Sequence, residues 1–254
     1  MSDCTIINIV GTDTDVGKTV VTAALAAALI NQGRSVALYK PTQTGVNPQE
    51  IGDVQYAAAL SGASPYEGVR LSHPMAPIAA AQLENKDLPT LQEHQQTIQM
   101  LASQFDVVIV EGAGGVTVDL TAPLATGPDY TPQNQADLIG LLPPETVTFI
   151  IARAGLGTLN HIALTADYLQ QRGIKTRDVI IGSWPKDPQR VEESNLQSLS
   201  NQGFTVLATL PRGAGKFFVV GKDEALPFNE QEIRQFRQDS SRWMQYALAA
   251  LGMP

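Results

Sequence analysis

The sequence predicts an α/β fold in which a doubly wound, mostly parallel sheet is flanked by helices on both faces. Short runs rich in Ile and Val alternate with longer amphipathic segments, and most connections between them are short. Such continuous apolar runs are typical of strands that are buried on both faces, as in a parallel sheet. Because no Pro/Gly/Ser linker divides the 254 residues, we expect residues 1–254 to form a single domain.

The pattern of apolar residues predicts where each strand and helix lies along the chain. Strands are expected at residues 5–10, 35–39, 107–110, 147–152, 179–182 and 205–209. Helices are expected at 17–31, 53–61, 91–104, 134–142, 159–171, 190–201 and 230–251. Asn229 followed by Glu232 predicts a capping box at the start of the last helix. Long loops are expected at 41–52 and 112–132, after predicted strands, where open α/β sheets bind their ligands.

Composition excludes several classes of function. The formal charge is −8, from 25 acidic and 17 basic residues, so non-specific binding to DNA or RNA is not expected. A single cysteine, Cys4, allows no intrachain disulfide. The first residues show no basic, apolar signal pattern, and no run reaches the ~18 apolar residues of a membrane span. We therefore expect a cytoplasmic protein with no membrane partner.

The strongest motif is GTDTDVGKT, Gly11 to Thr19, between the first strand and the first helix. It ends like a Walker A loop, although five residues rather than four separate Gly11 from Gly17. A glycine lets the backbone approach phosphate oxygens, and the helix start attracts the anion. Lys18 can neutralise the β- and γ-phosphates, and the Thr19 hydroxyl can bind Mg²⁺. The alternative, a capped helix start with an incidental lysine, does not explain this context.

Two acidic residues are candidates for holding a metal. Glu111 ends a buried strand in FDVVIVEGAGG, the position of a Walker B carboxylate. Its alternative is a solvated glutamate in a tight turn. Asp53 follows Gly52 at a predicted helix start, where an aspartate is more simply explained as a helix cap.

Several motifs together resemble the dethiobiotin synthetase family in order and spacing. They are GTDTDVGKT, Tyr39-Lys40-Pro41 with Gly45, Gly52-Asp53, VEGAGG, and GLGTLNH at 155–161. The resemblance covers roughly residues 6–212 and implies the three-layer sandwich of P-loop NTPases. It also implies an ATP- and Mg²⁺-dependent ligase. One amine of 7,8-diaminononanoate takes up CO₂ as a carbamate, ATP phosphorylates the carbamate, and the second amine closes the ring to dethiobiotin, releasing ADP and phosphate.

The resemblance assigns roles by position. Lys18, Lys40 and Thr44 would be catalytic, and Thr19, Asp53 and Glu111 would hold Mg²⁺. The nucleotide would be bound by Thr14, Asp15, Val16, Gly17, Lys18, Thr19, Val20, Asp53, Glu111, Gly114, Ser183, Pro211 and Arg212. The substrate would be bound by Thr12, Lys40, Thr44, Gly115, Gly157, Thr158, Leu159 and Asn160. In the family the last four lie at a dimer interface, which implies a homodimer with a shared substrate site.

Two positions depart from the family pattern. Ser183 stands where the family usually has an asparagine that reads adenine, and a serine cannot make that paired contact. ATP is the expected nucleotide, with CTP or another triphosphate as the alternative. Ile78 replaces a frequent histidine after Pro77, with no assigned consequence.

Two other functions are alternatives to the ligase. A ParA/MinD-like switch ATPase would act through protein partners, but such proteins usually carry a second lysine early in the phosphate loop, where this chain has Thr12, Asp13 and Thr14. A degenerate domain that binds nucleotide without turnover would not need Lys18, Thr19, Lys40, Asp53 and Glu111 together. His73, His94 and His161 have no triad or metal-ligand spacing.

Overall fold

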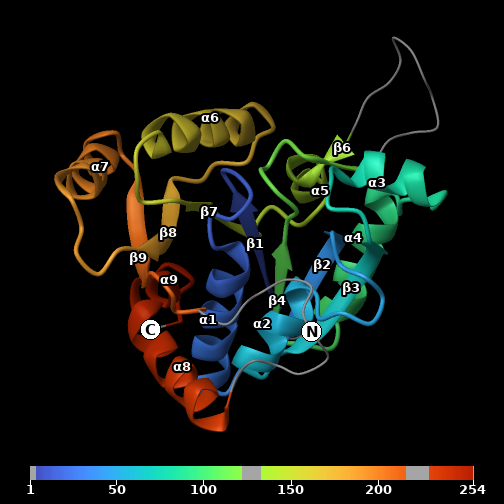
Figure 1. Cartoon of the computed structure of the whole chain (residues 1–254), viewed down its shortest axis with the longest axis horizontal. Helices are drawn as coiled ribbons and strands as arrows, with labels where there is room; N and C mark the ends of the chain where they lie inside the picture. The colour runs from blue at the N-terminus through green and yellow to red at the C-terminus, as the bar shows by residue number, and fades with distance from the viewer. Residues whose placement is uncertain (1–3, 122–132, 216–228, 254) are drawn as a thin grey trace.

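A seven-stranded parallel sheet forms the centre of the computed structural model, which describes residues 4–121, 133–215 and 229–253 (Figure 1). The strand order is β3-β2-β4-β1-β7-β8-β9, and all neighbours pair in parallel. The strands are β1 (Thr5–Gly11), β2 (Val36–Thr44), β3 (Ser64–Leu71), β4 (Val107–Glu111), β7 (Val147–Ala152), β8 (Asp178–Trp184) and β9 (Thr205–Pro211). A separate antiparallel pair joins β5 (Asp119–Thr121) to β6 (Gln133–Asn134).

Helices cover both faces of this sheet and complete a three-layer sandwich (Figure 1). One layer contains α1 (Lys18–Asn31), α2 (Asp53–Ser61), α8 (Glu230–Trp243) and α9 (Gln245–Ala250). The opposite layer contains α4 (Leu91–Ala102), α5 (Gln135–Gly140), α6 (Thr158–Gln171) and α7 (Arg190–Asn201). A further helix, α3 (Pro77–Glu84), packs near β3. The fold class expected from the sequence is therefore confirmed.

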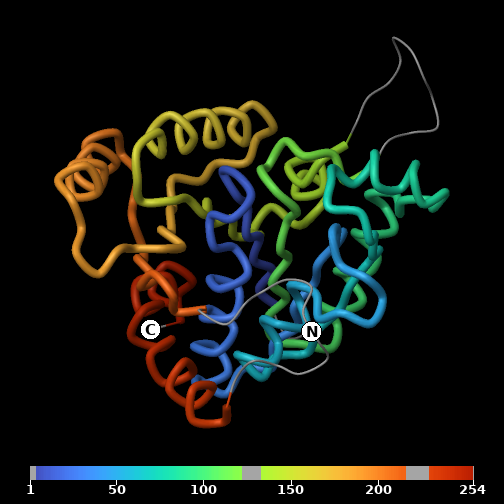
Figure 2. The backbone as a smooth tube through the Cα atoms, viewed as in Figure 1, coloured from blue at the N-terminus to red at the C-terminus, as the bar shows by residue number. Residues whose placement is uncertain are grey.

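The central strands alternate their side chains between the two helical layers. Ile7 and Ile9 of β1 lie in the apolar cluster with α1, whereas Val10 lies in the cluster with α6. These side chains are fully buried. Because every central strand is apolar on both faces, it reads in the sequence as a continuous run. Figure 2 shows the C-terminal helices beside α1, where Phe236 and Leu248 join the same core.

All six predicted strands are present, but four details of the prediction were wrong. The strand β3 and the helix α3 were missed. β2 continues to Thr44, so the loop expected at 41–52 begins later, and Pro41 lies within the strand. The last helix is interrupted at Met244, which turns α9 so that Ala247 and Leu248 reach the core. The second expected loop contains β5, and its residues 122–132 lie outside the described part of the chain.

The missed strand β3 has a physical explanation. It is an edge strand with the sequence SPYEGVRL and is mostly half-buried, so it lacks the continuous apolar run of the central strands. An edge strand also tolerates Pro65, since one side of its backbone needs no ladder partner.

Within the described ranges, no helix combines the length and the apolar character needed to cross a membrane.

A buried histidine packs behind β2. His94 of α4 is 1% exposed, and its Nδ1 lies 2.7 Å from the Tyr39 hydroxyl. Burial lowers the pKa of His94 from 6.5 to about 4. The neutral ring is therefore the form that the folded protein stabilises.

This burial predicts a pH-dependent stability. Between about pH 6.5 and 4 the unfolded chain protonates this histidine and the folded chain does not, so the free energy of unfolding should fall by about 3 kcal/mol as pH drops. Urea unfolding at a series of pH values measures this free energy. A His94→Gln variant, which cannot titrate there, should show a shallower slope, and identical slopes in the two proteins would contradict the assignment.

Candidate active site

The phosphate loop joins β1 to α1 and presents the free start of that helix. Gly17 adopts a left-handed conformation with φ 96°, and α1 begins at Lys18. Asp15 is also left-handed, with φ 57°. Since Gly17 has no side chain to cap the first N–H groups of α1, these groups remain directed at the cavity and can bind an anion.

The loop packs tightly against the end of β8 through two glycines. A Cβ on Gly182 would lie 2.2 Å from the carbonyl oxygen of Val16. A Cβ on Gly17 would lie 2.7 Å from the carbonyl oxygen of Gly182. Only glycine fits at either position, so β8 fixes the path of the phosphate loop. Gly182→Ala should therefore displace the loop and weaken nucleotide binding.

A cavity of about 680 Å³ opens beside the phosphate loop, above the carboxyl ends of β1, β2 and β4. Its walls come from the loop and α1, the end of β2, the start of α2, the segment after β4 and the residues before α3. The predicted site residues that line it are Thr14, Asp15, Gly17, Lys18, Thr19, Val20, Lys40, Thr44, Asp53, Glu111 and Gly114.

Lys40 forms the charged centre of this cavity. Its Nζ lies 2.8 Å from Asp53 Oδ2 and 2.7 Å from Glu111 Oε1. It also donates to the carbonyl oxygen of Gly112 at 3.1 Å. Burial alone would lower the pKa of Lys40, but the two carboxylates outweigh burial and raise it. Lys40 is therefore a permanent cation, suited to stabilising negative charge rather than to accepting a proton.

Lys18 lies on the phosphate-loop side of the cavity. Its Nζ donates to the carbonyl oxygen of Asp13 at 2.8 Å, and the residue is 7% exposed. Burial, and then the nearby charge of Lys40, lower the pKa of Lys18 to about 8. Asp13 is itself paired with Arg153, which keeps its carboxylate occupied outside the cavity.

The oxygen atoms around Lys40 fit a magnesium ion. The Thr19 hydroxyl donates to Glu111 Oε1 at 2.9 Å. The carboxylates of Asp53 and Glu111 both contact the ammonium group of Lys40. Glu111 is buried, and its Oε2 has no hydrogen-bond partner among the described residues. These ranges contain no group of three or more His, Cys, Asp or Glu side chains that could hold a metal alone. A hard ion here would complete its shell with phosphate oxygens and water, as Mg²⁺ commonly does.

The remaining predicted residues lie outside this cavity. Ser183, Pro211 and Arg212 are at the ends of β8 and β9, where the Arg212 N–H donates to the carbonyl oxygen of Trp184 at 2.6 Å. Thr12 donates from its N–H to the carbonyl oxygen of Ile151 at 2.9 Å. The others outside the cavity lining are Val16, Gly115, Gly157, Thr158, Leu159 and Asn160.

Sequence reasoning missed several cavity residues. Thr42 and Gln43 line it from β2, and another wall is formed by Pro74, Met75 and Ala76 before α3 and by Pro77 at its start. Thr42 and Gln43 lie between the recognised residues Lys40 and Thr44, and this closeness was the only available signal. The wall before α3 depends on β3, which the sequence did not reveal.

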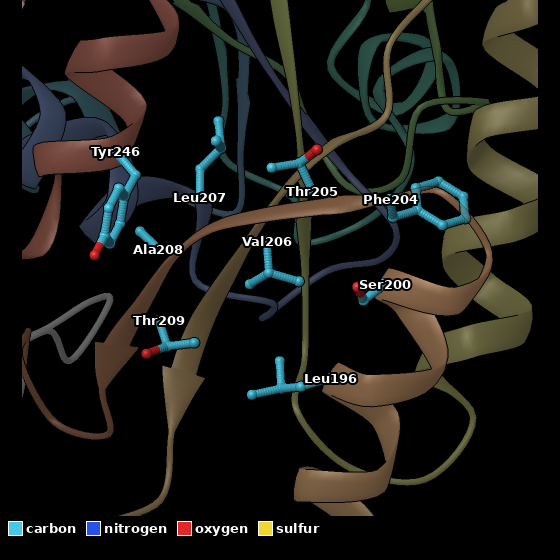
Figure 3. Close-up of a pocket in the computed structure, with 9 residues that line it drawn as sticks. All are labelled: Leu196, Ser200, Phe204, Thr205, Val206, Leu207, Ala208, Thr209 and Tyr246. Carbon is cyan, nitrogen blue, oxygen red and sulfur yellow. The ribbon is translucent and has the colours of Figure 1, made fainter.

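A second hollow, of about 480 Å³, lies along the edge strand β9 (Figure 3). Leu196 and Ser200 of α7 lie on one side of the strand and Tyr246 of α9 on the other. None of its lining residues is charged. It therefore offers no groups for phosphate chemistry, in contrast to the cavity at the phosphate loop.

The lowered pKa of Lys18 predicts a pH-dependent nucleotide affinity. A bound phosphate keeps the ammonium protonated, so above about pH 8 binding must take up a proton. The dissociation constant should rise about tenfold per pH unit above that value. Titration with a fluorescent nucleotide at several pH values measures this dissociation constant. In Lys18→Arg, whose side chain stays charged, the dissociation constant should change little with pH. Equal slopes would contradict the prediction.

The chain is similar to proteins whose activity is named. A family described as an AAA domain matches residues 6–214. The ATP-dependent dethiobiotin synthetase of Streptomyces coelicolor is 41% identical over 221 residues, covering 86% of this chain and 89% of that protein. The chain belongs to the dethiobiotin synthetase family. The synthetase of Streptomyces avermitilis is 42% identical, covering 84% of this chain and 86% of its own.

A solved structure supports the fold independently of these relatives. The cell division ATPase MinD of Pyrococcus furiosus superposes with a TM-score of 0.56 at 14% identity, over 98% of this chain and 100% of that one. This likeness concerns the fold alone. The much higher identity to dethiobiotin synthetases favours the ligase over a ParA/MinD-like switch ATPase.

Proposed function

We propose that this chain is an ATP-dependent ligase that closes the ureido ring of dethiobiotin from 7,8-diaminononanoate and CO₂. The family membership supports the reaction, and the placement of Lys40 between Asp53 and Glu111, beside the phosphate loop, is the observation that carries it. Phosphoryl transfer to a carbamate requires cations placed along the path of the phosphoryl group. Lys18 and Lys40 supply them from two walls of one cavity.

The proposed reaction has three steps. An amine of the substrate attacks CO₂, forms a C–N bond and releases a proton. A carbamate oxygen then attacks the γ-phosphorus of ATP, and the bond to ADP breaks. The second amine attacks the carbonyl carbon of the resulting anhydride, phosphate leaves, the ring closes and a proton is released.

The residues bind and orient these groups rather than forming a covalent intermediate. The free N–H groups at the start of α1 and Lys18 hold the phosphates. Lys40 stays protonated and faces the carbamate and the transferred phosphoryl group, while Thr44 at the end of β2 positions the substrate. Thr19, Asp53 and Glu111 would hold Mg²⁺. When bound, this ion would neutralise charge on the β- and γ-phosphates.

The start of α6 supports a homodimer with a shared substrate site. Leu156 is 87% exposed and Leu164 is 61% exposed, an unusual exposure for two leucines so close together. Thr158, Leu159 and Asn160 begin α6 between them. On a second copy this helix start would face the substrate carboxylate with its N–H groups.

The nucleotide base is assigned to the region of Ser183, Pro211 and Arg212. Gly182 packs against the phosphate loop, so this strand end would lie close to a bound triphosphate, which supports the assignment. ATP is the proposed co-substrate, in keeping with the names of the relatives. CTP remains the alternative because Ser183 lacks the paired donor and acceptor of an asparagine.

The decisive test is the release of nucleoside diphosphate by the purified protein with Mg²⁺ and bicarbonate. We expect release to require the diamine, with dethiobiotin detected by mass spectrometry, and parallel reactions with ATP, CTP and GTP to identify the base. Release that is indifferent to the diamine would overturn the ligase and favour a switch ATPase. No release and no product would favour a domain that only binds nucleotide.

A further inference from the structure

Asp53 is oriented by a glutamine from another element of the fold. The first N–H of α2, that of Asp53 itself, donates to Gln43 Oε1 at 2.8 Å. The preceding residue, Gly52, has no side chain with which to cap this helix. Gln43 therefore satisfies one of the free N–H groups at the start of α2, and it comes from β2, the strand that also carries Lys40. Its amide is held in turn, because Nε2 donates to the carbonyl oxygen of Thr44 at 3.0 Å.

Arg70 holds the segment that leads into α2. It lies opposite Gln43 in the β2–β3 register. Its guanidinium donates to both carboxylate oxygens of Glu67, at 2.7 and 2.9 Å, and to the carbonyl oxygens of Asn47 and Glu50, at 3.1 and 2.6 Å. It also reaches Gln55 Oε1 at 3.0 Å. A partly buried guanidinium with this many partners fixes the loop between β2 and α2.

These side chains converge on Gly52. A Cβ there would lie 2.8 Å from Gln55 Oε1, 2.9 Å from Arg70 Nη2 and 3.1 Å from Gln43 Oε1. The missing side chain is thus what allows the polar groups to approach the start of α2 so closely. The backbone of Gly52 has φ −88°, a conformation open to other residues, so a side chain here would displace these polar groups rather than strain the backbone.

The other end of α2 is anchored independently. Arg237 of α8 donates to the carbonyl oxygens of Leu60 at 2.8 Å and Ala59 at 3.3 Å. Loss of the Gln43 contact would therefore loosen the start of α2, where Arg70 and Lys40 still contact the first turn, and leave its last turn in place. The first turn carries the Asp53 carboxylate, which lies 2.8 Å from Lys40 Nζ.

We propose that Gln43, supported by Arg70, is a positioning residue that sets the Asp53 carboxylate for metal binding. The inference rests on the proposed function, in which Asp53 holds Mg²⁺. Gln43 Oε1 is engaged by the helix backbone, so it acts through Asp53 and not on the substrate. Contacts behind a metal ligand typically change metal affinity about 10- to 100-fold when they are lost.

The test compares Gln43→Met, which fills the same space without an acceptor, with Gln43→Glu, which keeps the acceptor. Binding of a fluorescent ATP analogue is measured against Mg²⁺ concentration, without diamine. Gln43→Met should raise the half-saturating Mg²⁺ concentration about tenfold, with nucleotide affinity in EDTA unchanged, and Gln43→Glu should restore the Mg²⁺ response. Gln95→Met is the matched control, because Gln95 is a half-buried glutamine of α4 whose amide also donates to a backbone carbonyl oxygen, that of Leu141.

Hydrogen exchange supplies a readout that needs no metal. In Gln43→Met the amide of Asp53 should exchange faster, while the amides near Leu60 should not. If Gln43→Met does not fold, Gln43→Asn, whose shorter side chain cannot reach the Asp53 N–H, is used in its place. An unchanged Mg²⁺ response, or an equal loss of affinity in EDTA, would overturn the proposal. These measurements contain no diamine, so they do not depend on ring closure. The role of Gln43 can be confirmed even if the wild-type protein makes no dethiobiotin, and it can be overturned even if the wild-type protein does.

Discussion

Replacing Lys40 with methionine should lower turnover about a thousandfold, because it removes a fixed cation from the proposed path of the phosphoryl group. The same change leaves Asp53 and Glu111 facing each other without the ammonium that lies 2.8 and 2.7 Å from them. Breaking a buried pair by removing one partner typically destabilises a protein by about 3 kcal/mol or more. The free energy of unfolding should therefore fall as well, although the site is at the surface of a cavity.

The two effects of Lys40→Met can be separated by magnesium. Mg²⁺ with nucleotide would neutralise the two carboxylates and recover much of the lost stability, but it would not recover turnover. Unfolding is measured in EDTA and in Mg²⁺ with ADP, and turnover by product formation. Lys175→Met, an exposed lysine between α6 and β8, is the control and should behave like wild type. Turnover above about a tenth of the wild-type value, or a free energy of unfolding that does not change with Mg²⁺, would contradict the proposed role of Lys40.

Glu111→Gln should abolish the response to magnesium while preserving the shape of the site. Glu111 accepts hydrogen bonds from Thr19 and Lys40 through Oε1, and its buried Oε2 has no partner in the described part of the chain. An amide keeps the volume but loses the charge that a divalent ion requires. We expect turnover to fall about a hundredfold or more at any Mg²⁺ concentration.

The same substitution has an opposite effect on metal-free nucleotide. Removal of a buried negative charge near the phosphates should leave binding in EDTA as tight as in the wild type, or tighter. Calorimetric titration of ADP with and without Mg²⁺ measures both quantities. Glu193→Gln, on the exposed side of α7, provides the control. Weaker binding in EDTA would indicate that Glu111 supports the phosphate loop itself and does not hold the metal.

Much of the fold was predictable because the central strands are buried on both faces and therefore appear as unbroken apolar runs. The phosphate loop and Glu111 were predictable for a related reason, since each lies at the end of such a run. The edge strand β3 lacks this signal and was therefore not predicted. The cavity wall formed by Pro74 to Pro77, which follows β3 in the chain, was not predicted either.

The contacts of Asp53 could not have been predicted from local sequence. An aspartate after a glycine has the pattern of an ordinary helix cap, and only the family resemblance suggested a metal ligand. In the structure its N–H is bound by Gln43, ten residues earlier in the chain. That contact depends on how β2 and α2 meet in space, and a single glutamine beside a known motif carries no pattern that reveals it.

The inner charges of the cavity have a consequence for the order in which ligands arrive. Lys18 and Lys40 face Asp53 and Glu111, so two buried ammonium groups cancel two inner carboxylates, and the exposed Asp15 adds a further negative charge at the rim of the cavity. The formal charge of the whole chain is −8. A bare triphosphate would approach an acidic molecule and find no net attraction within the cavity beyond the start of α1. Its magnesium complex carries much less negative charge and brings the missing cation with it. Metal and nucleotide should therefore enter as one unit, and free triphosphate should be a poor competitor of its own magnesium complex.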